Sequence, residues 1–135
     1  MTKFRAFPAL ALAFAALLML GSGPASANTV TYSASKFNQF KASGKPFMLD
    51  FFASWCSTCR AQERAIRAIK GEDKAYAKIT VMKVDWDKYK GSAIRKSLGI
   101  PRRSTLVMFR GGKEVGRVVA QTSKSSIKRL MKKGL

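Results

Sequence analysis

Two cysteines, Cys56 and Cys59, are the side chains in this sequence whose type and spacing best fit a chemical role. At the start of a helix, residues three apart lie close enough to form a disulfide without moving the backbone. Free backbone N–H groups and the helix dipole stabilise a thiolate at that place. The spacing predicts thiol–disulfide exchange, with Cys56 as an exposed attacking thiolate and Cys59, one turn further, as the shielded cysteine that resolves the intermediate.

Two other interpretations of the cysteine pair stay open. A structural disulfide is less favoured, because so short a ring restrains little of the entropy of the unfolded chain. Half of a metal site needs ligands from a second chain, since the sequence contains two cysteines and no histidine. The lack of histidine also excludes His-based catalytic triads. We expect the chemistry to need neither a metal nor a cofactor.

The segments around the cysteines predict how the pair is positioned. Residues 47–52 form a continuous apolar run with one acid, Asp50, as expected for a buried central strand. Residues 60–70 place apolar side chains on one face and cations elsewhere, which is typical of an amphipathic helix. We expect further strands at residues 30–32, 79–84, 105–109 and 114–119, and further helices at residues 35–43, at residues 92–98 and after Thr122 or Ser123. This order predicts one α/β domain with a central mixed β-sheet and helices on both faces.

Residues 1–27 have the layout of a cleaved secretory signal. Basic residues near the start are followed by an apolar run from Pro8 to Leu20, and small residues end at Ala27. The run is shorter than the roughly 20 residues that a membrane-spanning helix needs. We expect cleavage after Ala27, which leaves residues 28–135 as a single domain in an oxidising compartment. An uncleaved anchor is the alternative.

The composition is strongly basic. The sequence has 26 Lys and Arg residues against 7 Asp and Glu residues, for a formal net charge of +19. Many of the cations recur at spacings of three and four, which places them on the solvated faces of helices. They either form a solvated surface or attract acidic proteins or an anionic membrane surface. We do not expect nucleic acid as a partner, because the sequence contains no motif for binding it.

The stretch from Phe47 to Arg60 resembles the thioredoxin family. It matches the family's strand, its buried acid, its Trp-Cys-x-x-Cys motif and the basic residue that follows. The Lys45-Pro46 approach and the long helix after Cys59 look most like the periplasmic thioredoxin-like domain that ends the membrane-embedded disulfide reductase of bacteria. The resemblance extends in element order over residues 28–135. It implies a thioredoxin-like fold and a periplasmic thiol–disulfide oxidoreductase that acts on protein thiols and disulfides.

The resemblance also implies roles for single residues. Cys56 becomes the attacking thiol and Cys59 the resolving one. Asp50 becomes a buried carboxylate near Cys59 that accepts its proton, although a hydrogen-bonded acid at a strand end is the alternative, since burial of a charge is costly and raises an acid's pKa. Trp55 covers the surface of the active site as an apolar contact for substrate, or it serves packing alone.

One position departs from the family pattern. The family places a cis-proline directly before the strand that lies beside the cysteines. Counting back from the strand that begins at Thr105 assigns this position to Ser104, and a shift of three residues would be needed to bring Pro101 there. We expect a trans bond between Arg103 and Ser104, because a cis bond without proline costs about 3 to 4 kcal/mol. We assign substrate binding to Trp55, Arg103 and Ser104. The departure from the family pattern affects this substrate binding, and it also affects the protection of the cysteines from metals.

These observations favour one function over two others. The first is disulfide exchange by a monomer, where the positive surroundings of Cys56 favour an oxidant and the resemblance favours a reductase. We favour reduction, with electrons supplied by a membrane disulfide reductase. The others are a cationic binding module with a structural disulfide, and a metal or iron–sulfur binding variant between two chains.

Overall fold

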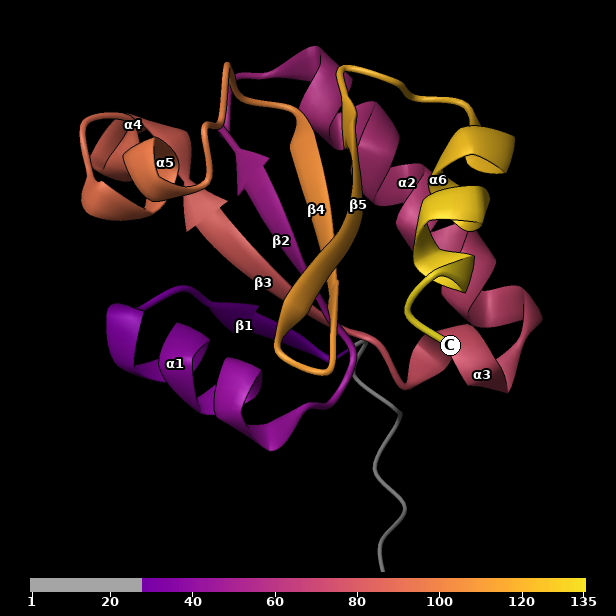
Figure 1. Ribbon diagram of the computed structural model, residues 1–135. Helices are drawn as coiled ribbons and strands as arrows, with labels where there is room; N and C mark the ends of the chain where they lie inside the picture. Colours follow the sequence, from indigo (N-terminus) through magenta and orange to yellow (C-terminus); the bar gives the residue numbers. More distant parts are fainter. Residues whose placement is uncertain (1–27) are drawn as a thin grey trace, which may run out of the picture.

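The computed structural model describes residues 28–135, and the predicted signal segment lies outside the described residues. Its centre is a five-stranded sheet with the order β1-β3-β2-β4-β5 (Figure 1). The strands are β1 (Thr29–Thr31), β2 (Phe47–Phe52), β3 (Thr80–Asp85), β4 (Thr105–Arg110) and β5 (Lys113–Val119). The first three strands run parallel to one another, while β4 is antiparallel to both β2 and β5. The predicted mixed sheet is confirmed.

Helices cover both faces of the sheet, as the sequence predicts. They are α1 (Ala34–Ser43), α2 (Ser57–Glu72), α3 (Lys74–Ala77), α4 (Trp86–Tyr89), α5 (Ala93–Ser97) and α6 (Lys124–Lys132). In Figure 1, α1, α4 and α5 lie on one side of the sheet, and α2, α3 and α6 lie on the other. The chain therefore has the three-layer α/β architecture of a thioredoxin-like fold.

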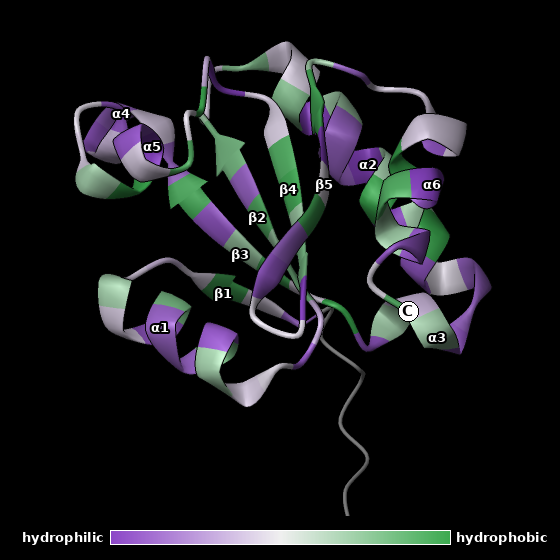
Figure 2. Cartoon of the chain, in the orientation of Figure 1, coloured by the Kyte–Doolittle hydropathy of each residue, from purple (hydrophilic) through white to green (hydrophobic). Residues whose placement is uncertain are grey.

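The alternation of side chains along β2 divides the core into two halves. Phe47, Leu49 and Phe51 point into the cluster under α1 and α5, whereas Met48 points into the cluster under α2 and α6. In Figure 2, hydrophobic colour covers much of β2 and β4, and a hydrophilic band crosses β2 among its hydrophobic residues. Because successive strand residues face opposite sides, Asp50 shares the face of Met48 and points toward α2. The fold thus directs one acid into the layer that also carries the cysteines.

The β4–β5 hairpin turns on two glycines and packs against the end of α1. Gly111 and Gly112 have φ angles of +59° and +75°, which residues with a Cβ rarely adopt. The amide of Gly111 donates to the carbonyl of Gly44, the C-cap of α1, over 3.0 Å. A Cβ on Gly112 would lie 2.7 Å from the carbonyl oxygen of Lys41. The turn therefore depends on Gly112 for space as well as for conformation.

The helix boundaries differ from the sequence prediction in two respects. The amphipathic pattern marks residues 60–70, whereas α2 extends over Ser57–Glu72, with Cys56 as the N-cap at the predicted head of the helix. The short helices α3 and α4 were not predicted, since four residues are too few to show a hydrophobic period. Within residues 28–135, no helix is both long and apolar enough to cross a membrane.

Candidate active site

The two cysteines lie where β2 passes into α2. Cys56 has an extended backbone conformation as the N-cap, and its Sγ accepts a hydrogen bond from the amide of Cys59 over 3.1 Å. The two Cα atoms are 5.3 Å apart, and the side chains form a disulfide. The predicted placement of both residues at the head of a helix, within disulfide reach, is confirmed.

The exposure predicted for Cys56 is wrong for this disulfide-bonded state. Cys56 is 3% exposed and Cys59 is 4% exposed, so both are buried to the same degree. Ala53 packs against both residues, and the Ser104 hydroxyl closes over the sulfurs, with its Oγ 3.2 Å from Cys56 Sγ and 3.1 Å from Cys59 Sγ. The sequence analysis assigns Ser104 to the position beside the cysteines, and the structure shows that its hydroxyl contacts both sulfurs.

Ser104, and not Pro101, is the residue beside the cysteines. It has a φ angle of +60°, and residues 28–135 contain no cis peptide bond. Its amide donates to the carbonyl of Phe51 over 2.7 Å, and its carbonyl accepts from the amide of Ala120 over 2.8 Å. The residue is also fully buried. Because its amide and its carbonyl both have partners within the protein, neither backbone group of Ser104 is available to a substrate. Within the predicted substrate-binding set, Trp55 and Arg103 are the residues nearer the surface.

Gln62 holds the Ser104 loop against α2, a role that the sequence analysis missed. Its side chain is fully buried, and its Nε2 donates to the carbonyls of Ser104 and Gln121 over 2.9 Å and 3.0 Å. The available signal was its position four residues before Ile66, on the apolar face of the helix. A buried amide on such a face needs partners, and here the partners are loop carbonyls.

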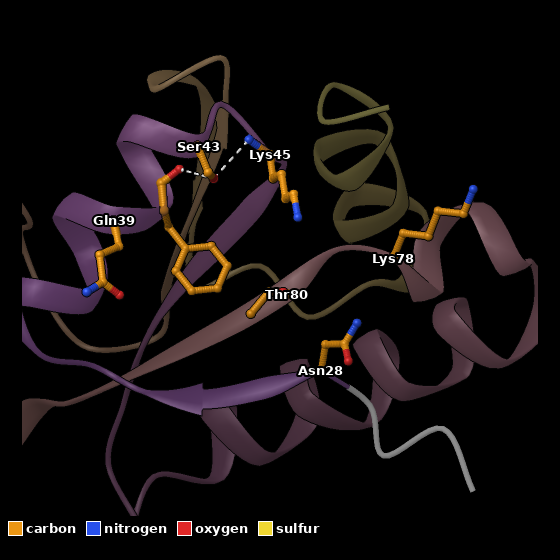
Figure 3. A pocket seen from close by; sticks show the side chains of 7 residues that line it. Asn28, Gln39, Ser43, Lys45, Lys78 and Thr80 are labelled. Carbon is orange, nitrogen blue, oxygen red and sulfur yellow. Dashed lines mark hydrogen bonds between the residues drawn. The ribbon is translucent and has the colours of Figure 1, made fainter. Parts of the chain in front are cut away.

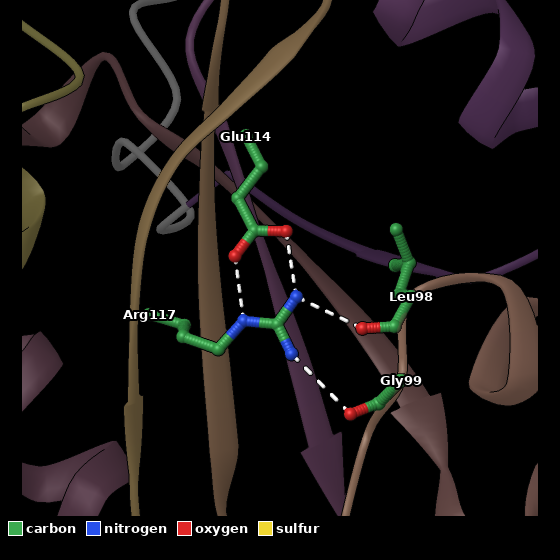
Figure 4. A network of polar contacts seen from close by, with 4 residues as sticks. All are labelled: Leu98, Gly99, Glu114 and Arg117. Carbon is green, nitrogen blue, oxygen red and sulfur yellow. Dashed lines mark hydrogen bonds and ion pairs between the residues drawn. The ribbon is translucent and has the colours of Figure 1, made fainter.

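Arg117 of β5 anchors the other end of the same loop (Figure 4). Its guanidinium donates to Leu98 O over 2.9 Å and to Gly99 O over 3.5 Å, so it ties the end of α5 to the edge strand. Two further bonds, of 2.6 Å and 2.7 Å, join it to both carboxylate oxygens of Glu114. The segment that leads to Ser104 is thus fixed before it reaches the cysteines.

Asp50 lies beneath the cysteines on the α2 side of the sheet. It is 2% exposed, and among the described residues its Oδ1 has no hydrogen-bond partner. Burial raises the pKa of the Asp50 carboxyl to about 7; the positive charge of Lys83 opposes this rise, and the negative charge of Glu63 adds to it. A cavity of about 180 Å³ is lined by Asp50 together with Cys59, Glu63 and Lys83. Asp50 and Cys59 therefore face one partly open cavity, whose lining also includes the exposed residues Ser54 and Arg60.

Lys83 and Glu63 complete the polar surroundings of Asp50, and sequence reasoning singled out neither. Lys83 is the direct neighbour of Asp50 in the pairing of β2 with β3. Its Nζ lies 3.1 Å from Glu63 Oε1, and Arg67 contacts the same oxygen at 3.2 Å. The ammonium of Lys83 also lies 4.6 Å from the ring centroid of Phe52. Because Lys83 is bound to Glu63 rather than to Asp50, the Asp50 carboxyl stays unpaired.

Trp55 forms the exposed surface next to the disulfide. Its side chain is 55% exposed, and its indole N–H donates to Asp87 Oδ2 over 2.9 Å. The guanidinium carbon of Arg103 lies 4.4 Å from the centroid of the Trp55 ring, within cation–π distance. Trp55 and Arg103 are thus brought together, as one patch with an aromatic and a cationic part. The role of Asp87 was not predicted, because nothing in the sequence marks it apart from the other acids.

Another polar hollow lies at the opposite end of the sheet. It has a volume of about 470 Å³, and its lining comprises Asn28, Gln39, Phe40, Ser43, Lys45, Lys78 and Thr80 (Figure 3). Lys45 precedes β2 and Thr80 begins β3, whereas the cysteines follow the other end of β2. Among residues 28–135, no three Cys, Asp or Glu side chains gather as a metal site would require. The chemistry is therefore concentrated at the Cys56–Cys59 end.

Comparisons with known proteins point to the same kind of site. The family model described as Thioredoxin matches residues 28–133. A thioredoxin of Chlamydia caviae is 34% identical over 99 residues, which cover 73% of this chain and 91% of that protein. Among solved structures, Trxlp of Edwardsiella tarda has 34% identity and a TM-score of 0.68, over 76% of this chain and 97% of that one. A thioredoxin of Malassezia sympodialis has 28% identity and a TM-score of 0.61, over 77% and 94% of the two chains.

Proposed function

The chain belongs to the thioredoxin family, and from that membership we propose that this thiol–disulfide oxidoreductase works as a reductase of protein disulfides. The observation that carries the proposal is the Cys56–Cys59 pair at the N-terminus of α2, beside a buried acid with a raised pKa. A binding module needs no such acid. A reductase needs a proton acceptor at that place.

The proposed cycle runs through both sulfurs. The Cys56 thiolate attacks a substrate disulfide, forms a mixed disulfide and releases the first substrate thiolate. Cys59 then loses its proton and attacks Cys56 Sγ, which restores the Cys56–Cys59 disulfide and releases the second substrate thiolate. The two electrons come from the cysteine pair, and the departing thiolates take up protons. A dithiol donor must afterwards reduce the pair again.

Asp50 supplies the proton acceptor for the second step. Its carboxyl and Cys59 line the same cavity, and a pKa of about 7 allows it to take up or give up a proton near neutral pH. The ionised form is unfavourable in this buried place, which makes Asp50 a stronger base than an exposed carboxylate. Its unpaired Oδ1 leaves an oxygen free to receive the proton.

The patch of Trp55 and Arg103 is the proposed docking surface for substrate proteins. An exposed indole offers apolar contact area, and the guanidinium above it favours an acidic residue near the substrate disulfide. The excess of cations over acids in the whole chain supports the same preference. We therefore propose acidic proteins as preferred substrates, with an anionic membrane surface as a second site of attraction.

Paired peptides test this preference. Two disulfide peptides that differ only by Glu or Lys next to the cysteine are compared by kcat/KM. The Glu peptide is expected to react faster, and Arg103→Gln to reduce its advantage by up to about fivefold, the size of one exposed ion pair. Arg110→Gln, at the exposed end of β4, is the matched control that leaves the advantage intact. Equal rates for the two peptides would contradict the proposal.

The reductase direction and the export of the protein are proposals that rest on sequence. The Lys45-Pro46 approach and the predicted signal support a periplasmic protein that a membrane disulfide reductase keeps reduced. Equilibration of the cysteine pair with glutathione measures the direction. A reduction potential near about −120 mV, the range of strong oxidants, would overturn it. Mass measurement of the protein's N-terminus after expression in a Gram-negative host tests cleavage after Ala27.

Cysteine variants test the exchange itself. Cys56→Ser is expected to abolish reduction of a protein disulfide such as that of insulin. Cys59→Ser is expected to retain the first step and to accumulate a mixed disulfide, because the resolving sulfur is missing. Ser57→Ala, an exposed residue between them, is the control that keeps turnover. A binding module is instead supported if the parent protein shows no turnover and Cys56→Ser still captures the partner.

A further inference from the structure

We propose that the Ser104 hydroxyl is a catalytic hydrogen-bond donor that stabilises the Cys56 thiolate and so makes the cysteine pair less reducing than the same fold would be without it. This inference rests on the proposed thiol–disulfide exchange. It concerns the position where this chain carries serine in place of the family's proline.

The first argument is the position of the Ser104 oxygen. Its Oγ lies 3.2 Å from Cys56 Sγ and 3.1 Å from Cys59 Sγ. Among the described residues, these two sulfurs are the hydrogen-bond partners recorded for this hydroxyl. Because the side chain is fully buried, its proton has to be directed at a sulfur if it is to be satisfied. The hydroxyl therefore acts on the reacting atoms directly.

The second argument is that the backbone fixes this oxygen in place. Ser104 has a φ angle of +60°, a conformation that is strained for a residue with a Cβ. Three hydrogen bonds hold it there. Its amide donates to Phe51 O, and its carbonyl accepts from Ala120 N and Gln62 Nε2. A donor that is held in advance loses little entropy when the sulfur becomes charged. Strain kept at a reacting centre is a frequent feature of functional sites.

The third argument is the change in charge on reduction. A disulfide sulfur is a neutral and weak acceptor, whereas a thiolate is an anion. Hydrogen bonds to ionised groups are roughly twice as strong as those between neutral groups. The hydroxyl therefore stabilises the reduced, ionised site more than the disulfide. A pair whose reduced form is stabilised is a weaker reductant.

Its position between the sulfurs also suits the second step of the cycle. When Cys59 loses its proton, the negative charge moves from one sulfur to the other. The hydroxyl can turn from Cys56 Sγ to Cys59 Sγ, since the two distances differ by only 0.1 Å. Two donors then serve the site in sequence: the Cys59 amide acts on Cys56 alone, and Ser104 acts on both sulfurs.

Ser104→Ala tests the proposal, because it removes the oxygen and keeps the Cβ and its backbone requirement. The equilibrium with glutathione is expected to shift roughly tenfold toward the disulfide form, which for two electrons corresponds to about 30 mV. The thiolate fraction of Cys56 at a given pH, followed by ultraviolet absorbance, is expected to fall by a similar factor. A residue that serves structure alone would change neither quantity.

Two further variants separate the hydroxyl from its surroundings. Ser104→Gly also lacks the hydroxyl but relieves the left-handed strain, so it is expected to show the potential of Ser104→Ala and a higher stability. Thr105→Val removes a neighbouring buried hydroxyl that donates to Arg102 O and not to a sulfur. It is expected to keep the parent potential and thiolate fraction.

Each outcome bears on one proposal. An unchanged potential in Ser104→Ala overturns the role of the hydroxyl, and so does the parent potential in Ser104→Gly, because that variant also lacks the hydroxyl. Failure of the parent protein to reduce any protein disulfide would instead count against the proposed function. A changed potential in Thr105→Val would show that loss of any buried hydroxyl suffices, and it would also overturn the assignment.

Discussion

At the scale of single residues, the fold keeps Asp50 in an environment that disfavours its charge. Its neighbours in the sheet and on α2 form an ion pair with each other, Lys83 with Glu63, and not with Asp50. Such an acid lowers the stability of the protein whenever it is ionised. Function and stability therefore oppose each other at this position.

The pH dependence of stability reveals this opposition. The native protein keeps the Asp50 proton up to about pH 7, whereas an unfolded aspartate loses it near pH 4. Between these values the native state binds more protons than the unfolded state, so this group makes the free energy of unfolding fall as pH rises. The decline in the free energy of unfolding over this pH range is on the order of a few kcal/mol, and we expect Asp50→Asn to remove it.

Denaturant unfolding at a series of pH values measures the effect. The difference between Asp50→Asn and the parent protein is expected to grow in favour of the variant from about pH 4 to about pH 7 and to stay constant above that range. Asp73→Asn is the matched control, because Asp73 is exposed and asparagine also serves as an N-cap. A parallel pair of curves for Asp50→Asn and the parent would contradict the raised pKa.

The sequence identifies the reacting residues better than their surroundings. Cys56, Cys59 and Asp50 stand out because their types are unusual for the places they occupy. Gln62 and Asp87 do not stand out, because an amide or an acid at a helical or turn position is ordinary until its partner is known. Their partners lie on other segments of the chain, which only the folded arrangement brings near.

At the scale of elements, the β4–β5 turn limits where the hairpin can lie against α1. We expect Gly112→Ala to lower the free energy of unfolding by about 2 kcal/mol or more, because its Cβ would collide with Lys41 O as well as occupy a left-handed conformation. Gly111→Ala is the control: it has the same sign of φ and no atom within 4 Å. It is expected to lose about 1 kcal/mol from conformation alone. Equal losses would contradict the steric argument.

Arg117 tests how β5 supports the loop that carries Ser104. Arg117→Met keeps the apolar stem and removes the bonds to Leu98 O, Gly99 O and Glu114. The free energy of unfolding is expected to fall by about 1 to 2 kcal/mol, discounted because the ion pair is partly exposed. Glu114→Gln removes only the ion pair and is expected to lose less than half as much. A larger loss in Glu114→Gln would assign the support to the ion pair rather than to the carbonyl bonds.

The predicted elements agree with the structure where a period or a run is long enough to be read. The apolar run at β2 gives the correct strand, and the helix predicted after Thr122 or Ser123 is α6, with Ser123 as its N-cap. The amphipathic pattern shows only the middle of α2, because Ser57 and Thr58 carry no helical period, and it is the cysteine pair that marks the head of this helix. The short helices were missed for the same reason, and their formation depends on the caps Asp73 and Asp85.

At the scale of the whole molecule, the excess of cations distinguishes this chain. Acids are so few that single carboxylates serve two cations each: Glu63 contacts Lys83 and Arg67, and Glu72 contacts Lys124 and Lys128. The remaining cations repel one another, and compaction increases that repulsion. The sequence predicts this property fully, because a net charge needs no knowledge of the fold.

Self-repulsion makes the protein's stability depend on salt. Because the Debye length falls from about 30 Å at 0.01 M to about 8 Å at 0.15 M, added sodium chloride screens the cations from one another. We expect the free energy of unfolding to rise by on the order of 1 kcal/mol over that range, which for a domain of this size raises Tm by about 4 to 8 °C. Thermal unfolding followed by circular dichroism measures the shift.

A combined Lys36→Gln, Lys90→Gln and Lys132→Gln variant, which neutralises three exposed cations, is expected to be more stable at low salt and to respond less to salt. A fall in Tm with salt would show that the ion pairs of the few acids outweigh the repulsion among the cations.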